Sequence, residues 1–366
     1  MITFFISSHG FGHASRQIEV INALGARAPG LPIRVRTDGW RALYDRTLTV
    51  PVTFEPGPCD TGVVQLDSLR LDAAESIRQA GAFHRTLGAR AAGEARALAA
   101  SGARLVVGDI PPLAFAAAAE AGLPSVALSN FTWDWIYEGY AEEIALAPDL
   151  LPAVRAAYAR ATEAWRMPIG GGFAAFEVVR DHPMIARHAR REPAAVRAAL
   201  DLPADRPLAL VSFGGHGTPT FSFSSLDCLD LAGVVFTSGL AGPPGVTPAG
   251  VFVLDEARMY ALGLRYEDLV GAADVVVTKP GYGILSECIA NHTAMLYTSR
   301  GRFVEYDAMV EAMPRYLRCQ YLDQEALVAG RWRAALEALL AQPDPPETLP
   351  THGADVAAER MLEMIE

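Results

Sequence analysis

The stretch Ala273–Glu287 (ADVVVTKPGYGILSE) constrains the fold of this chain more than any other. It contains the β-branched run Val275–Val277, which is typical of a fully buried parallel strand. The turn Thr278–Gly283 follows, and Ile284–Asn291 favours a helix. A strand, a glycine-rich turn and a helix in this order present free backbone N–H groups at the helix N-terminus, where an anion can bind. The sequence therefore predicts a parallel α/β fold with an anion site here.

Two side chains of this stretch add chemistry to the predicted anion site. Lys279 lies in the turn and would contribute a positive charge. Glu287 lies one turn into the helix, where its carboxylate could accept hydrogen bonds from two vicinal hydroxyls, as on a ribose. A phosphate site and a diol acceptor on one turn indicate a nucleotide. An ordinary βα turn with a surface glutamate would produce the same pattern, so that interpretation stays open.

A second glycine-rich turn is predicted at the same sheet edge. Pro207–Phe213 (PLALVSF) is typical of a strand, and Gly214–Thr218 follows it. Two such turns fit a diphosphate held between them, where backbone N–H groups and Lys279 would stabilise its negative charge. Further along, Arg302 or Glu305 would reach the group beyond the diphosphate.

The N-terminus also begins with a predicted βαβ unit. The strand Ile2–Ser7 is followed by a turn, a helix and the strand Pro32–Thr37. Gly10–Ser15 approaches the dinucleotide motif GxGxxG, with Ser15 in place of the last glycine. Asp38 follows where an acid could hold a ribose. An NAD(P) site at this turn is therefore an alternative to the nucleotide site predicted at Ala273–Glu287.

Histidines flank this first turn, although a phosphate turn does not need them. His13 would lie at the carboxyl end of the first strand, where a neutral imidazole can act as a general base. Asp109 ends the apolar strand Arg104–Asp109, and it would orient His13 if these strands are neighbours. A capping or solvated His13 and an N-cap Asp109 are the structural alternatives. His9 is a weaker candidate for the same site.

Three other stretches bear on the site. Residues 129–137 (SNFTWDWIY) are dense in aromatics, which indicates either a pocket wall or core packing. Gly62–Ser68 is expected to be a mobile loop near the site. Arg180–Arg197 carries five arginines, and we interpret it as a solvated linker leading into the first helix of a second domain, with a basic patch for an anionic partner as the alternative.

Composition excludes several classes of protein. The chain has 366 residues, enough for two domains, with 51% hydrophobic and 20% charged residues, as in a globular enzyme. Its net charge of −11 makes nucleic acid an unexpected partner. The four cysteines form no CxxC, which favours a cytoplasmic location, and no stretch predicts a signal peptide or a membrane span. There is no P-loop motif and no cluster with metal-ligand spacing, so neither a metal nor another cofactor is expected.

The motifs together resemble those of the GT-B glycosyltransferases. The turn Gly214–Thr218, the segment TKPGYGILSE and the loop Arg300–Tyr306 are similar to the donor-binding segments of the lipid-II-forming N-acetylglucosaminyltransferases, in which the acid matching Glu287 binds ribose. The N-terminal region of plant L-arabinokinases is more similar still. It shares segments resembling SSHGFGHASRQIEV, VVGDIPPLAFAAAAEAGLPSVALSNFTWDWIYEGY and TKPGYGILSE. Those proteins continue into a sugar kinase domain that we do not recognise in this chain, so kinase activity is not expected.

A further resemblance keeps a different reaction open. The turn containing His13 is similar to the GFGH turn of the GT-B-like UDP-sugar hydrolase of pseudaminic acid synthesis. Where that resemblance includes a His–Asp dyad, the dyad would map to His13 and Asp109. A nucleotide-sugar hydrolase or epimerase, or a non-catalytic nucleotide-sugar-binding module, are therefore alternatives to a transferase.

These resemblances imply a GT-B protein with two Rossmann-like domains facing across a cleft. We expect an acceptor domain at residues 1–180, a donor domain at 181–350 and a C-terminal helix at 351–366 that returns to the first domain. The expected activity is metal-independent, inverting transfer from a UDP-sugar to a hydroxyl, with His13 and Asp109 as the base dyad. The expected nucleotide-sugar residues are Gly214, Gly215, His216, Gly217, Leu264, Arg265, Lys279, Gly281, Tyr282, Gly283, Ser286, Glu287, Arg302 and Glu305. The expected acceptor residues are His9, Phe11, Gly12, Asn130 and Trp133.

Overall fold

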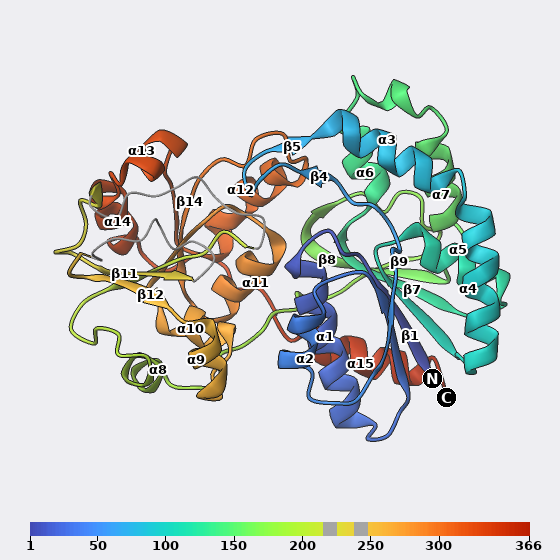
Figure 1. Ribbon diagram of the computed structural model, residues 1–366, viewed down its shortest axis with the longest axis horizontal. Helices are drawn as coiled ribbons and strands as arrows, with labels where there is room; N and C mark the ends of the chain where they lie inside the picture. The colour runs from blue at the N-terminus through green and yellow to red at the C-terminus, as the bar shows by residue number, and fades with distance from the viewer. Residues whose placement is uncertain (215–224, 238–247) are drawn as a thin grey trace.

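The computed structural model describes residues 1–214, 225–237 and 248–366, and it contains two parallel sheets flanked by helices (Figure 1). The first sheet has the order β3-β2-β1-β6-β7-β8-β9, and neighbouring strands pair in parallel. Its strands are β1 (Ile2–Ile6), β2 (Ile33–Thr37), β3 (Thr53–Pro56), β6 (Leu105–Asp109), β7 (Ser125–Phe131), β8 (Glu163–Gly171) and β9 (Val179–Asp181). The accompanying helices are α1 (Phe11–Arg27), α2 (Arg41–Thr47), α3 (Ala73–His84), α4 (Leu87–Ser101), α5 (Pro112–Glu120), α6 (Trp133–Glu138), the 3-10 helix η1 (Ile144–Leu146) and α7 (Leu150–Tyr158).

The second sheet has the order β12-β11-β10-β13-β14-β15 and is also parallel within the described residues. Its strands are β10 (Leu208–Val211), β11 (Gly233–Thr237), β12 (Val251–Leu254), β13 (Val275–Thr278), β14 (Ala294–Tyr297) and β15 (Cys319–Tyr321). The remaining helices are α8 (Pro193–Ala199), α9 (Glu256–Ala261), α10 (Tyr266–Ala272), α11 (Tyr282–Ala290), α12 (Glu305–Tyr316), α13 (Gln324–Ala329), α14 (Arg333–Leu340) and α15 (Gly353–Glu363).

The strands at the centres of both sheets are buried along their whole length. β1, β6, β7, β10 and β13 have no exposed residue, because helices cover both faces of each sheet. The valine run at 275–277 lies in β13, and α11 begins at Tyr282 after a short turn, so the predicted order of strand, turn and helix is confirmed, with the helix starting two residues earlier than predicted. β10 lies beside β13, which puts Gly214 and Lys279 at the same sheet edge, as predicted.

The last helix, α15, packs against α1 rather than against the second sheet. Ala357 and Met361 of α15 share a buried apolar cluster with Ile18 and Ile21 of α1. The two chain termini therefore lie close together beside the first sheet (Figure 1).

We call the part of the molecule built on the first sheet the first half and the part built on the second sheet the second half. A hairpin from the first half crosses to the second half. We call residues 62–72 the crossing hairpin; it contains the antiparallel pair β4 (Val64–Gln65) and β5 (Leu71–Asp72). Leu69 is buried in the apolar cluster of the second sheet, and the Ser68 hydroxyl donates a 2.8 Å hydrogen bond to the Phe213 carbonyl. Figure 1 shows β5 reaching the neighbourhood of α12. The segment expected as a loop near the site is thus anchored in both halves.

Candidate active site

A cavity of about 480 Å³ lies between the two halves and receives side chains from both. The N-termini of α1 and α11 meet at this cavity. Their backbones come so close that a Cβ atom on Gly283 would lie 3.3 Å from the Cα atom of Gly12. Each helix end directs free N–H groups and partial positive charge toward the same space, which favours an anionic ligand.

His13 and Asp109 form the predicted pair. The pairing of β1 with β6 aligns Ile6 with Asp109, so the carboxylate sits beside the turn that leads into α1. Nδ1 of His13 lies 2.9 Å from Oδ1 of Asp109, and both side chains are buried. An ionised carboxylate can only accept hydrogen bonds, so this contact places the imidazole proton on Nδ1. Nε2 then keeps its lone pair, and no described residue hydrogen-bonds to it.

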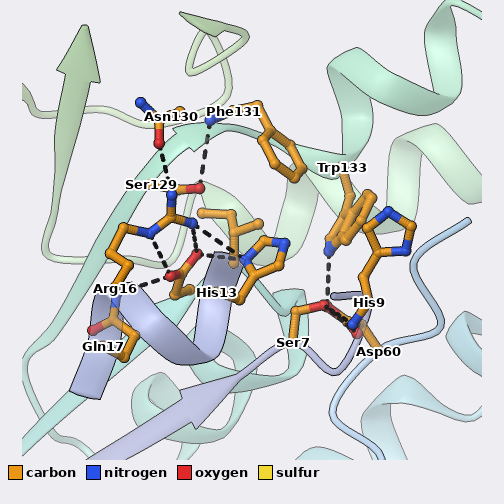
Figure 2. Close-up of polar contacts among 12 residues, drawn as sticks. Ser7, His9, His13, Arg16, Gln17, Asp60, Ser129, Asn130, Phe131 and Trp133 are labelled. Carbon is orange, nitrogen blue, oxygen red and sulfur yellow. Dashed lines mark hydrogen bonds and ion pairs between the residues drawn. The ribbon is translucent and has the colours of Figure 1, made fainter. Parts of the chain in front are cut away.

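Arg16 is the main site residue that the sequence analysis missed. Its guanidinium contacts both oxygens of Asp109, Nε to Oδ2 at 2.8 Å and the terminal nitrogen to Oδ1 at 2.7 Å (Figure 2). Gln17 donates to Oδ2 at 2.9 Å. Burial opposes ionisation of Asp109, but the charges and hydrogen bonds of Arg16 and His13 outweigh it and hold the pKa of this carboxyl well below its usual range. The spacing of three residues between His13 and Arg16 on one helix was the available signal.

Asn130 and Trp133 were predicted to contact the acceptor, but neither lines the main cavity. The side-chain oxygen of Asn130 accepts a hydrogen bond from Arg16 at 2.6 Å, and the side-chain nitrogen of Asn130 donates to the Pro168 backbone carbonyl. Trp133 is buried, and its indole N–H donates to Asp60 at 2.8 Å. Both side chains therefore use their polar groups to hold neighbours of His13.

Asp60 supports the turn that carries His9. Its carboxylate accepts hydrogen bonds from the Ser7 hydroxyl at 3.0 Å and from Trp133, and the Ser7 oxygen accepts from the His9 backbone N–H at 3.3 Å (Figure 2). Burial raises the pKa of Asp60 to about 6, and the hydrogen bond from Trp133 limits the rise. Nothing in the sequence distinguished this aspartate from other loop residues.

The first half also supplies an aromatic wall to the cavity. His9, Phe11 and Gly12 line it as predicted, joined by Trp40 and Phe131. The Phe11 and Trp40 rings lie 4.8 Å apart, and Trp40 remains 46% exposed at the surface. This wall presents apolar surface directly beside the His13 imidazole.

The second half supplies the turn after β13. Lys279, Gly281, Tyr282 and Gly283 all line the cavity. Burial, together with the charge of Arg300, lowers the pKa of Lys279 well below its usual value, and no described residue forms an ion pair with it. Tyr282 stacks on Phe131 at 5.8 Å, and its buried hydroxyl has no hydrogen-bond partner among the described residues.

Glu287 lines the cavity but is already engaged by an arginine. Oε1 of Glu287 accepts from two guanidinium nitrogens of Arg187, one of them Nε at 2.7 Å, whereas no described residue hydrogen-bonds to Oε2. Burial raises the pKa of Glu287 to about 7; Arg187 opposes the rise, and the nearby carboxylates Glu267 and Glu19 add to it. Arg187 comes from the stretch that we interpreted as a solvated linker, and that interpretation is wrong at this position because its side chain is buried.

Several predicted donor residues lie elsewhere. Arg302 is exposed and pairs with Glu143 at 2.6 Å, whereas Arg300 of the same loop lines the cavity and pairs with Glu305, also a cavity residue. Leu264 and Arg265 do not line the cavity, where Tyr260 and Tyr266 are found instead. Ser286 directs its hydroxyl to the Gly283 carbonyl at 2.8 Å. Gly214 lines the cavity, and Gly215, His216 and Gly217 lie outside the described residues.

The structure gives little support to the NAD(P) alternative. Asp38, the expected ribose acid of that site, is exposed and is not among the residues that line the cavity. In the part of the chain that the structure describes, no group of His, Cys, Asp and Glu side chains could hold a metal ion, and no helix is long and apolar enough to cross a membrane.

Comparison with known proteins first gives the fold. No family model matches the chain. The glycosyltransferase SnogD from Streptomyces nogalater superimposes with a TM-score of 0.56 at 18% identity, over 100% of this chain and 99% of that one. The glycosyltransferase VinC, solved with dTDP, gives 0.59 at 16% identity over 100% and 95% of the two chains. UGT89C1 from Arabidopsis thaliana, solved with UDP, superimposes with a TM-score of 0.57 at 14% identity, over 100% of each chain. The chain has the GT-B fold.

The sequence comparison agrees with the predicted resemblance. The chain is 25% identical over 344 residues to L-arabinokinase from Arabidopsis thaliana, which covers 92% of this chain. It spans about a third of that relative, 32% of its length. The likeness to the lipid-II-forming enzymes stays a prediction. The GT-B fold places the cavity between its two halves without fixing the reaction.

Proposed function

We propose that this protein transfers a sugar from a nucleotide-diphosphate sugar, first of all a UDP-sugar, to an acceptor hydroxyl. Residues 1–180 would bind the acceptor and residues 181–350 the donor. The observation that carries the proposal is that His13, paired with the buried Asp109, lines the same cavity of a GT-B fold as Lys279 and the N-terminus of α11. A base and a cradle for a leaving diphosphate are the two parts that such a transfer needs.

The proposed reaction is inverting and metal-independent. Nε2 of His13 would take the proton of the acceptor hydroxyl, and the acceptor oxygen would form a bond to the anomeric carbon as the bond from that carbon to the diphosphate oxygen breaks. The diphosphate would leave with that electron pair toward the N–H groups of α11. Its negative charge would favour the protonated form of Lys279. Such preorganised donors usually supply the largest part of the catalytic effect.

The donor site is tested first by calorimetric titration with UDP in the absence of metal. We expect micromolar binding to the wild type and a loss of affinity of tenfold or more in Glu287→Ala, since Oε2 would no longer accept from the ribose hydroxyls. Glu325→Ala removes an exposed carboxylate on α13 and is the matched control. Binding of NAD(H) without binding of UDP would contradict the proposal.

The pH dependence of this binding follows from the raised pKa of Glu287, about 7. The carboxylate would be about a tenth ionised at pH 6 and about nine tenths at pH 8. Because the ionised form is the better acceptor for ribose hydroxyls, we expect UDP affinity to rise between these values. In Glu287→Gln, the pH dependence of binding that remains should be the one caused by the titration of UDP itself. Identical pH profiles for the two proteins would show that Glu287 does not hold the ribose.

A further inference from the structure

We propose that Arg16 is a positioning residue that favours the unprotonated form of His13, so that the pair with Asp109 rests as a base. The inference rests on the proposed role of His13 and requires no particular donor or acceptor. Arg16 contacts His13 only on the side of Nδ1, where its terminal nitrogen lies 3.3 Å away. Arg16 also lines the cavity, and the inferred action of Arg16 on the reaction is through the imidazole.

The guanidinium of Arg16 neutralises the negative charge of Asp109 whether or not His13 is protonated. The two hydrogen bonds of 2.8 and 2.7 Å form a bidentate pair with the carboxylate, which is the strongest arrangement available to these groups. With a neutral His13, the three side chains carry no net charge. With a protonated His13 they carry one positive charge in a buried site, where charge is poorly solvated.

The position of His13 on α1 acts in the same direction. His13 is the third residue of this 17-residue helix, whose N-terminus carries partial positive charge. An imidazolium at that end would be repelled by the free N–H groups and by Arg16. Asn130 fixes the guanidinium from the opposite side through its 2.6 Å hydrogen bond, so Arg16 cannot turn away without losing a buried partner.

Among the described residues, Asp60 and His9 are further titratable groups close to His13. Asp60, from the segment after β3, is buried nearby and favours a protonated His13, and the pKa of Asp60 is raised to about 6 mainly by burial. His9 lies on the turn after β1, with its ring centre 6.4 Å from that of His13. Asp109 itself favours the imidazolium, but it shares its charge with Arg16. Removing Arg16 would leave both carboxylates acting on His13 without compensation.

The test is a pH titration of His13 by NMR, with the protein labelled with carbon-13 at its histidine rings. His13→Asn identifies the resonance of His13 by its disappearance. In Arg16→Met the titration midpoint of His13 should rise by about one pH unit or more, because a like charge next to the imidazole is lost. Arg16→Lys keeps the charge but loses the bidentate contact, so a smaller rise is expected.

Controls separate this role from general disturbance of the fold. Arg27→Met removes an exposed arginine of the same helix, paired with Asp355, and should leave the midpoint unchanged. The resonance of His182, buried beside α15, reports whether each variant is folded, and Arg16→Lys decides the question if Arg16→Met fails to fold. A midpoint that stays constant or falls in the folded Arg16 variants overturns the inference. The titration needs no substrate, so a failure of UDP binding would count against the proposed function alone.

Discussion

Replacing His13 with alanine is expected to lower the turnover of a UDP-sugar at least about a hundredfold, while the affinity for UDP stays within about twofold. Nε2 of His13 is the only polar side-chain atom of the His13–Asp109 pair without a hydrogen-bond partner among the described residues, and His13 lines the cavity. The nucleotide would be held by groups of the other half, which this substitution does not touch. The measurement is UDP release with a panel of UDP-sugars and acceptor alcohols, alongside UDP calorimetry.

The matched control for this experiment is His188→Ala. His188 is exposed and contacts the Thr351 hydroxyl at 3.0 Å. It follows the cavity residue Arg187 but does not itself line the cavity, so its loss should leave both quantities unchanged. Turnover of His13→Ala near the wild-type rate would rule out the base assignment. A parallel loss of UDP affinity would instead indicate that His13 holds the diphosphate.

Replacing Arg187 with alanine should lower the free energy of unfolding by about 3–5 kcal/mol at pH 8. Arg187 is the buried cation between Glu287 and Glu267, with the charge of Glu19 nearby. Without it, buried carboxylates face one another and must either stay charged or take up protons. Chemical denaturation in urea measures the difference.

The sign of the pH dependence distinguishes this explanation from a simple packing defect. A carboxyl whose folded pKa lies above its unfolded value favours folding at low pH, and this contribution is lost as the pH rises through the folded pKa, here about 7 for Glu287. Loss of Arg187 should raise that pKa further, so the destabilisation should be larger at pH 8 than at pH 5. Arg190→Ala removes a half-exposed cation 3.9 Å from Glu19 and should cost less than about 1 kcal/mol. An equal loss at both pH values would contradict the charge explanation.

The parts of the site that the sequence predicted are those carried by local pattern. A valine run followed by a glycine-rich turn required β13 and α11, and an aspartate ending a buried strand required a place at the carboxyl edge of the sheet. The contact between His13 and Asp109 followed once β1 and β6 became neighbours. The α/β class was predicted from the same local patterns, whereas the GT-B fold was implied by the resemblance to known families; both are confirmed.

The parts that the sequence could not give depend on contacts between distant segments. Arg187 lies 100 residues before Glu287, and a run of arginines in a linker gives no sign that one of them is buried. Arg300 and Arg302 are two residues apart in one loop, and only the path of that loop decides that Arg300 enters the cavity while Arg302 reaches Glu143. Asp60 acquires its place from Ser7 and Trp133, which no spacing rule connects.

The crossing hairpin has a consequence for any attempt to divide the molecule. Leu69 belongs to the first half by sequence but completes the apolar core of the second, and Ser68 satisfies the Phe213 carbonyl there. A fragment beginning near residue 181 would lack both contributions and would expose the apolar surface of the second sheet against which Leu69 packs. The two halves are therefore not interchangeable modules, and a hybrid with another GT-B protein would have to carry residues 62–72 together with the surface that receives them.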